Sequence, residues 1–153
     1  LMRESHPGDV VALVGDLGAG KTRFVEGAAR ALGYRGRVRS PSFTLLNIYR
    51  ATLPIYHFDL YRWEPATQGV EWEEWEERID GEGVSLIEWA DRLESRIPSR
   101  ALLVSIAHAG DESRLVTVAA AEEHHRLHVQ RLDEEVSGGA LEGVEQGPQD
   151  DRE

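Results

Sequence analysis

Two kinds of hydrophobic spacing alternate along the chain up to residue 121. Continuous apolar, β-branched runs predict buried strands at 10–14 and 84–87, and the first is typical of a central parallel strand. Apolar positions that recur with the period of a helix predict helices at 22–32 and 70–79. This alternation favours an α/β fold.

The other segments complete the predicted fold, with strands at 43–49, 55–60, 101–107 and 115–121 and helices at 90–97 and 122–132. The first two of these strands flank a short turn and predict an antiparallel hairpin over 43–60. We therefore expect one three-layer domain over residues 1–131, whose sheet is mostly parallel apart from this hairpin.

Charge separates this domain from the end of the chain. The 153 residues carry a net charge of −11, and residues 132–153 hold eight acidic residues and one basic residue. That stretch is rich in glycine and poor in aromatic residues, so we predict a disordered acidic tail. The overall acidity also disfavours unaided binding to nucleic acid, which needs clustered positive charge.

Composition also narrows the class of protein. The chain has no cysteine, which excludes disulfides and thiolate metal sites. No apolar run approaches the roughly 18 residues of a membrane span, and no secretory signal opens the sequence. We expect a cytoplasmic protein that does not associate with a membrane.

A glycine-rich segment between the first strand and the first helix carries the clearest chemistry. Residues 15–22 read Gly-Asp-Leu-Gly-Ala-Gly-Lys-Thr and match the phosphate-binding P-loop, whose backbone N–H groups cradle phosphate oxygens. In this pattern Lys21 faces the β- and γ-phosphates, and the Thr22 hydroxyl binds Mg²⁺. The predicted nucleotide-binding residues here are Asp16, Leu17, Gly18, Ala19, Gly20, Lys21, Thr22 and Arg23.

The census of basic residues supports this interpretation. Lys21 is the single lysine beside 16 arginines, as expected where a compact charge must fit inside a tight loop. A GTPase would use a second lysine in an Asn-Lys-x-Asp element that reads guanine, and this chain has none. We therefore expect ATP rather than GTP.

A P-loop also needs an acidic partner for the metal, and two strand ends supply candidates. Glu88 follows the strand at 84–87, and Asp59 lies at the end of the strand at 55–60. Either carboxylate could also orient the attacking water. The alternatives are an exposed strand-end carboxylate for Glu88 and a helix or turn cap for Asp59.

Four segments in this order resemble one family: the P-loop, Ser40-Pro41-Ser42-Phe43-Thr44-Leu45, Tyr56-His57-Phe58-Asp59-Leu60-Tyr61-Arg62 and Leu86-Ile87-Glu88-Trp89. Over about residues 7–121 the chain resembles the bacterial TsaE (YjeE) ATPases. The resemblance implies a P-loop NTPase-like fold and an ATPase that works with the TsaB and TsaD proteins. That machinery forms N6-threonylcarbamoyladenosine at position 37 of ANN-decoding tRNAs, so tRNA would be met through the complex.

The resemblance also implies roles for single residues. Lys21 and Thr22 would hold phosphate and Mg²⁺, and Glu88 would be the acidic residue linked to the metal. Asp59 would lie by the active site, Trp89 would flank the nucleotide, and residues 40–44, with Ser42, would form a switch-like loop. Family members usually have Thr at position 42. They also usually carry further residues before Pro7 that help to form the adenine side of the pocket, so we expect that an N-terminal segment is missing here.

Two other functions are compatible with a P-loop. A small-molecule kinase would use Arg37, Arg39, Arg50 or Arg62 to clamp the transferred phosphoryl group. A nucleotide sensor would act through its ATP-bound shape with negligible turnover.

Several further features have ordinary explanations. His124 and His128 share a predicted helix face but lack an evident third ligand, so a solvated helix is favoured over a zinc site. Trp72 and Trp75 are expected in the core or at a partner contact, and His57 is expected in the core. The arginines beside the switch-like loop form either a solvated surface or a docking site for tRNA or a partner; they are Arg30, Arg35, Arg37 and Arg39.

Overall fold

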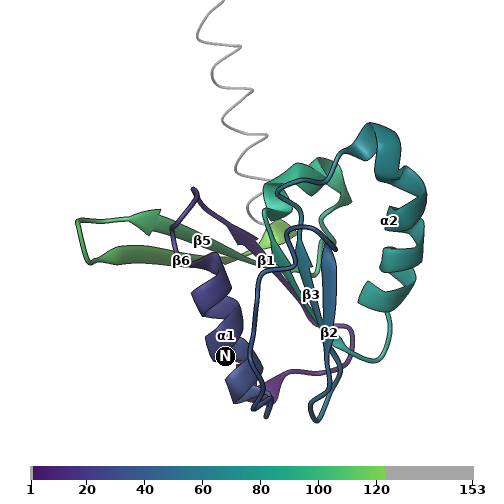
Figure 1. The fold of residues 1–153 in the computed structure, drawn as a ribbon, viewed down its shortest axis with the longest axis horizontal. Helices are drawn as coiled ribbons and strands as arrows, with labels where there is room; N and C mark the ends of the chain where they lie inside the picture. The colour runs from purple at the N-terminus through teal and green to yellow at the C-terminus, as the bar shows by residue number, and fades with distance from the viewer. Residues whose placement is uncertain (1, 123–153) are drawn as a thin grey trace, which may run out of the picture.

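The computed structural model describes residues 2–122, with the backbone alone over 65–70. Its centre is a six-stranded sheet in the order β2-β3-β4-β1-β5-β6 (Figure 1). The strands are β1 (Val10–Val14), β2 (Leu46–Tyr49), β3 (Ile55–Asp59), β4 (Val84–Glu88), β5 (Leu102–His108) and β6 (Arg114–Ala120). The helices are η1 (Met2–Glu4), α1 (Lys21–Ala31), α2 (Pro65–Ile79) and η2 (Ala90–Arg96).

The sheet is parallel at its centre and antiparallel at both edges. Strands β3, β4, β1 and β5 pair in parallel, whereas β2 runs antiparallel to β3 and β6 antiparallel to β5. The mostly parallel sheet and the hairpin over 43–60 are therefore confirmed, and the strands around the Gly110-Asp111 turn form a second antiparallel pair. Because β3, β4 and β1 are parallel, their carboxyl ends lie at one edge of the sheet.

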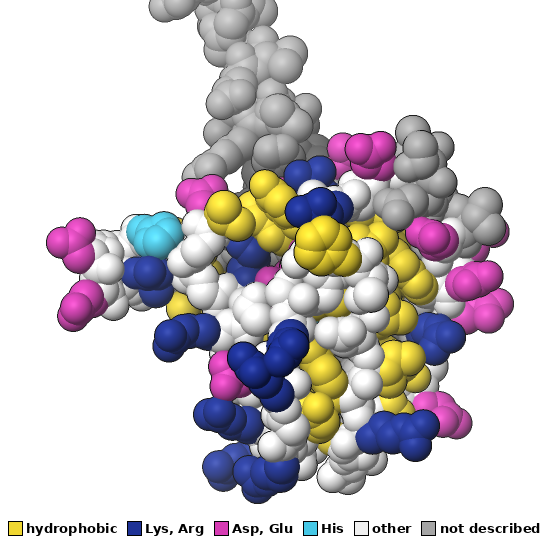
Figure 2. Space-filling model, viewed as in Figure 1, with side chains coloured by type: hydrophobic (Ala, Val, Ile, Leu, Met, Phe, Trp, Pro, Cys, Tyr) yellow, Lys and Arg dark blue, Asp and Glu magenta, His cyan; other side chains and the backbone are white. Residues whose placement is uncertain are grey.

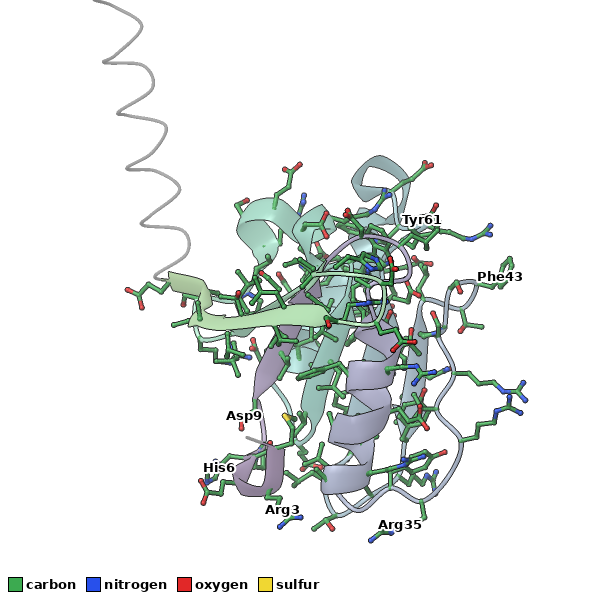
Figure 3. All side chains as sticks on the ribbon, turned by 90° about the vertical axis from the view of Figure 1, so that its left-hand side faces the viewer. Arg3, His6, Asp9, Arg35, Phe43 and Tyr61 are labelled. Carbon is green, nitrogen blue, oxygen red and sulfur yellow. The ribbon has the colours of Figure 1, made fainter. Side chains whose placement is uncertain are left out.

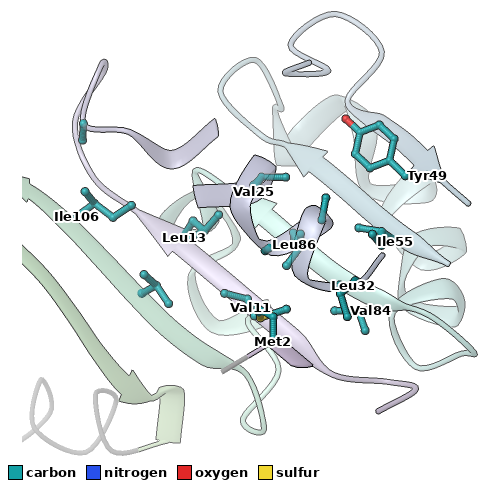
Figure 4. Close-up of a cluster of buried hydrophobic side chains, with 14 residues drawn as sticks. Met2, Val11, Leu13, Val25, Leu32, Tyr49, Ile55, Val84, Leu86 and Ile106 are labelled. Atoms are coloured by element: carbon teal, nitrogen blue, oxygen red, sulfur yellow. The ribbon is translucent and has the colours of Figure 1, made fainter. Parts of the chain in front are cut away.

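Helix α1 covers one face of the sheet. Alternate residues of the central strands, among them Val11, Leu13 and Leu86, pack there against Val25 and its neighbours in α1 (Figure 4). The apolar stripe of α1 faces this cluster because Val25, Ala28, Ala29 and Leu32 recur at helical spacing. Burial of this stripe fixes the start of α1 over the edge where β1 ends.

Helix α2 and the short helix η2 cover the opposite face, which confirms three layers (Figure 1). Trp75 packs on Phe58 with ring centroids 5.3 Å apart, and Trp72 packs beside Trp75. Both tryptophans are buried, which confirms the core assignment of the two options expected for them. Since each strand side chain alternates between faces, Ile55, His57 and Asp59 of β3 share the α1 side, opposite Phe58.

Two elements begin several residues away from the predicted positions and one helix is of another type, each for a local reason; the remaining bounds agree to within one residue. β2 begins at Leu46 rather than 43 because Leu45 has φ 64° and its N–H donates to the Pro41 carbonyl at 2.7 Å. α2 begins at Pro65, a residue favoured in the first helical turn, rather than at 70. The segment at 90–96 is 3₁₀ in form with a break at Glu94 (φ 51°, ψ −119°), and its buried Ala90 and Leu93 match three residues per turn.

Some predictions fall outside the described residues. The helix expected at 122–132 after its first residue, the His124 and His128 pair, and the tail at 132–153 belong to this group. Within residues 2–122, no helix combines the length and the apolarity that crossing a bilayer demands.

Gly15 and Gly27 differ in the space around them, so substituting each by alanine tests how tightly the backbone is packed. A Cβ on Gly15 would lie 2.4 Å from the Ile106 carbonyl oxygen, and its φ of 155° disfavours a side chain. We expect Gly15→Ala to lower the free energy of unfolding by about 1–3 kcal/mol. Gly27 in α1 has open space around it, so Gly27→Ala should stabilise by about 0.5–1 kcal/mol.

Urea unfolding of the two variants and the parent measures both changes. Equal stability of Gly15→Ala and the parent would show that the backbone near Ile106 yields at little cost.

Candidate functional site

The loop between β1 and α1 places backbone groups around an open space. Gly20 immediately precedes α1 with φ 113°, and no side chain caps the helix there. The first N–H groups of α1 are therefore available to a ligand at the positive end of the helix. The close approach of Gly15 to β5 holds the other end of the loop against the sheet.

Lys21 begins α1 and bends its side chain back into this loop. Its ammonium donates to the carbonyls of Gly15 at 2.5 Å and Asp16 at 2.8 Å, and it lies 4.0 Å from the centroid of the Trp89 ring. The residue is only 5% exposed. Burial lowers the pKa of the Lys21 ammonium, and the surrounding carboxylates, Glu88 foremost, act in the opposite direction. A buried cation whose hydrogen bonds go to neutral carbonyl oxygens is well suited to an incoming anion.

Thr22, the next residue, meets the carboxylate at the end of β4. The Thr22 hydroxyl lies 3.0 Å from both Glu88 oxygens, and Glu88 is 3% exposed. These oxygen donors fit Mg²⁺, which uses one or two protein oxygens together with phosphate and water. Among the residues that the structure describes, no three His, Cys, Asp or Glu side chains form a metal cage of their own.

Asp59 lies beside Glu88 at the same edge. The two residues are direct partners in the parallel pairing of β3 and β4, and Asp59 is 4% exposed. Its carboxylate accepts a hydrogen bond from Ser40 and another from the Tyr61 N–H at 3.0 Å. Asp59 thus caps a turn, as one alternative expected, and at the same time faces the site.

A single cleft joins these groups, and we call it the P-loop cleft. It has a volume of about 830 Å³, and every predicted site residue except Asp16 lines it. Asp16 contributes its carbonyl oxygen to Lys21 instead. Ser42 lines the cleft 3.4 Å from the Ser40 hydroxyl, whereas Phe43 projects away from the body (Figure 3).

One wall of the cleft was missed by sequence reasoning. Ile106, Glu112, Arg114 and Val116 line it from the β5–β6 ribbon, and the Arg114 Nε–H donates to the Ala19 carbonyl at 3.1 Å. Arg114 and Ala19 are 95 residues apart in the chain, and no local sequence pattern indicates a contact between such distant residues. Arg62, one of four arginines weighed as a phosphoryl clamp, also lines the cleft.

His57 is buried, as expected, but it also contacts the site. Its Nε2 lies 2.8 Å from a Glu88 oxygen and its Nδ1 lies 2.9 Å from the Tyr49 hydroxyl. The period of two along a strand places residues 57 and 59 on one face, and this signal could have revealed the contact.

Four of the exposed arginines lie on one helix and the loop that follows it. Arg30, Arg35, Arg37 and Arg39 are exposed on α1 and the loop after it, whereas acidic side chains crowd the α2 side (Figure 2). Arg30 pairs with Glu26 at 2.8 Å.

Comparison with known proteins places these features in context. A family model described as threonylcarbamoyl adenosine biosynthesis protein TsaE matches residues 1–116. The tRNA threonylcarbamoyladenosine biosynthesis protein TsaE of Bacillus subtilis is 40% identical over 84% of this chain and 80% of its own length. The protein of the same name from Treponema pallidum is 40% identical over 73% and 82%.

A solved structure agrees with the sequence matches. The crystal structure of Bacillus subtilis YdiB superposes with a TM-score of 0.65 and 36% identity, covering 88% of this chain and 82% of that one.

Trp89 should report on occupation of the P-loop cleft. It lines the cleft, whereas Trp63, Trp72 and Trp75 are buried in the α2 layer. A nucleotide that draws Lys21 from the indole should change the tryptophan fluorescence, and Trp89→Phe should remove most of that change. Titration with Mg-ATP measures it, and a signal that persists in Trp89→Phe would come from another tryptophan.

Proposed function

The chain belongs to the TsaE family, whose P-loop fold implies nucleotide binding, and from this premise we propose that it binds and hydrolyses ATP with Mg²⁺. The hydrolysis would serve the formation of N6-threonylcarbamoyladenosine on tRNA, the pathway that the relatives are named for. The observation that carries the proposal is the convergence of Lys21, Thr22 and Glu88 at the start of α1. The cytoplasm, where tRNA is available, is the proposed place of action.

The residues of the cleft divide the work of phosphoryl transfer. The loop N–H groups and the Lys21 ammonium would bind the β- and γ-phosphates, because a preorganised positive site stabilises charge as it develops. Thr22 and Glu88 would hold Mg²⁺, which when bound neutralises charge on the phosphate oxygens. Since the Thr22 hydroxyl contacts Glu88, we assign the metal to that carboxylate. Asp59 is then free to orient the attacking water.

The rim of the cleft is suited to a partner that senses the nucleotide. Leu17, Phe43 and Tyr61 are large apolar residues exposed near the loop, and Phe43 is 82% exposed beneath the Arg62 guanidinium. Exposed apolar side chains gathered near a ligand site are typical of a protein–protein contact. We propose that the TsaB and TsaD proteins bind here when Mg-ATP orders residues 40–44.

Lys21 provides the direct test of ATP hydrolysis. Lys21→Ala removes the charge from the β- and γ-phosphate positions, so ATP turnover should fall by about 100-fold or more, or about 2.7 kcal/mol of barrier. Arg30→Ala, on the exposed side of the same helix, is the control and should keep the parent rate. Phosphate release measures the rate, and circular dichroism checks the fold. A folded Lys21→Ala protein within about threefold of the parent would contradict the proposal.

Ser42 provides the test of coupling to the partners. Affinity for the TsaB–TsaD pair should be about tenfold higher with a non-hydrolysable ATP analogue than with ADP or no nucleotide. Ser42→Ala should reduce this difference more than it reduces ATP binding, because the Ser42 hydroxyl lines the cleft. Thr52→Ala, an exposed hydroxyl in the turn between β2 and β3 and outside residues 40–44, is the control. Calorimetry measures all affinities.

The outcomes also separate the alternatives. Equal partner affinity in the three nucleotide states would remove the switch. Nucleotide-dependent binding without detectable hydrolysis would identify a sensor, and a phosphorylated small molecule among the products would identify a kinase.

A further inference from the structure

A line of hydrogen bonds runs behind the Glu88 carboxylate, away from the P-loop cleft. His57 lies between Glu88 and Tyr49, at 2.8 Å from a carboxylate oxygen and 2.9 Å from the hydroxyl. The Tyr49 hydroxyl in turn lies 3.1 Å from the Arg39 carbonyl oxygen. This line connects the site carboxylate with the backbone that leads into Ser40 and Ser42.

The direction of these bonds follows from the donors available. A backbone carbonyl and a carboxylate only accept, so Nε2–H must donate to Glu88. Tyr49 either donates to Arg39 and accepts from Nδ1–H, or donates to Nδ1. Burial raises the pKa of the Tyr49 hydroxyl, which keeps its proton available for either bond. In both arrangements the ring nitrogen next to Glu88 carries a proton.

Packing alone does not account for a histidine at this position. The side chain is fully buried on the α1 face of β3, among apolar residues such as Ile55 and Leu86. An apolar residue would fill that space without the cost of burying two ring nitrogens. A polar residue is needed here because of Glu88, which is a buried carboxylate. Within the described residues, the side-chain hydrogen bonds that orient this carboxylate come from Thr22 and His57 alone.

We propose that His57 is a positioning residue, which holds the Glu88 carboxylate in place for the metal ion and ties it through Tyr49 to the backbone at Arg39. The inference rests on the proposed assignment of Mg²⁺ to Glu88. Partners that orient a metal-binding carboxylate typically change metal affinity by about 10–100-fold when they are removed. His57 does not line the cleft, so it acts on the metal position through Glu88.

At its other end, this line of hydrogen bonds reaches the backbone at Arg39, just before the loop that contains Ser40 and Ser42. The Arg39 carbonyl also accepts from Asn47 Nδ2 at 3.1 Å, and the Tyr49 ring stacks on Tyr34 with centroids 4.8 Å apart. In the arrangement in which Tyr49 donates to Arg39, two donors from β2 hold the backbone before Ser40. A shift of Glu88 on binding the metal would be transmitted to this backbone through His57 and Tyr49.

Two amide substitutions separate positioning from packing. In His57→Gln the amide nitrogen reaches the place of Nε2 and can still donate to Glu88. In His57→Asn it reaches only the place of Nδ1, on the Tyr49 side. Both variants bury a polar amide of similar chemistry, so they form a matched pair.

The measurement is Mg²⁺ titration of each full-length variant with a non-hydrolysable ATP analogue, followed by tryptophan fluorescence. His57→Asn should raise the Mg²⁺ concentration for half-saturation by about 10-fold or more, whereas His57→Gln should stay within about threefold of the parent. Affinity for the analogue without Mg²⁺ should change less than about twofold in both, because Lys21 and the loop N–H groups are intact. Tyr49→Phe should give a smaller rise than His57→Asn.

Two results would overturn the inference. The Mg²⁺ concentration for half-saturation could be unchanged in both amide variants, or it could be raised equally in both. Glu88→Gln distinguishes this failure from failure of the proposed function. If Glu88→Gln raises half-saturation while the histidine variants do not, the metal assignment stands and the role of His57 falls. If Glu88→Gln leaves Mg²⁺ binding unchanged, the metal assignment itself is wrong.

Discussion

The burial of opposite charges at one edge of the sheet is the constraint on which the site depends. Lys21, Asp59 and Glu88 are all nearly inaccessible, and a buried charge without a partner is costly. Parallel pairing brings the ends of β3, β4 and β1 together, so the carboxylates lie near the ammonium that begins α1. Hydrogen bonds from hydroxyl, amide and imidazole groups then fix each carboxylate, which leaves a preorganised cleft.

The part of this site that the sequence predicted is the part governed by local rules. A buried strand followed by glycines and a helix defines the P-loop, and strand ends define Glu88 and Asp59. These rules require only that the strands run in parallel, which their apolar character indicates. The family resemblance added Ser42 and Trp89, and the structure places both on the cleft.

The rest of the site depends on tertiary contacts that no local pattern encodes. Arg114 reaches Ala19 only because β5 lies beside β1 and the ribbon folds back over the P-loop. Tyr49 meets Arg39 because Leu45, with its positive φ, delays the start of β2. The 3₁₀ form of residues 90–96 likewise reflects the fit of Ala90 and Leu93 into the core, where packing overrides helix propensity.

The outer end of the β5–β6 ribbon is expected to open more readily than the rest of the sheet. Residues 102–105 of β5 pair with both β1 and β6, whereas 106–108 pair with β6 alone, so the tip is a two-stranded projection (Figure 1). Such a projection is marginal by itself and opens more readily than a sheet interior. It meets the loop through Ile106, which lies close to Gly15, and through the hydrogen bond from Arg114, and its residues form one wall of the cleft. The tip is therefore a local folding unit whose stability depends on its contacts with the phosphate loop. The rate of amide hydrogen exchange at the tip would report whether those contacts are intact.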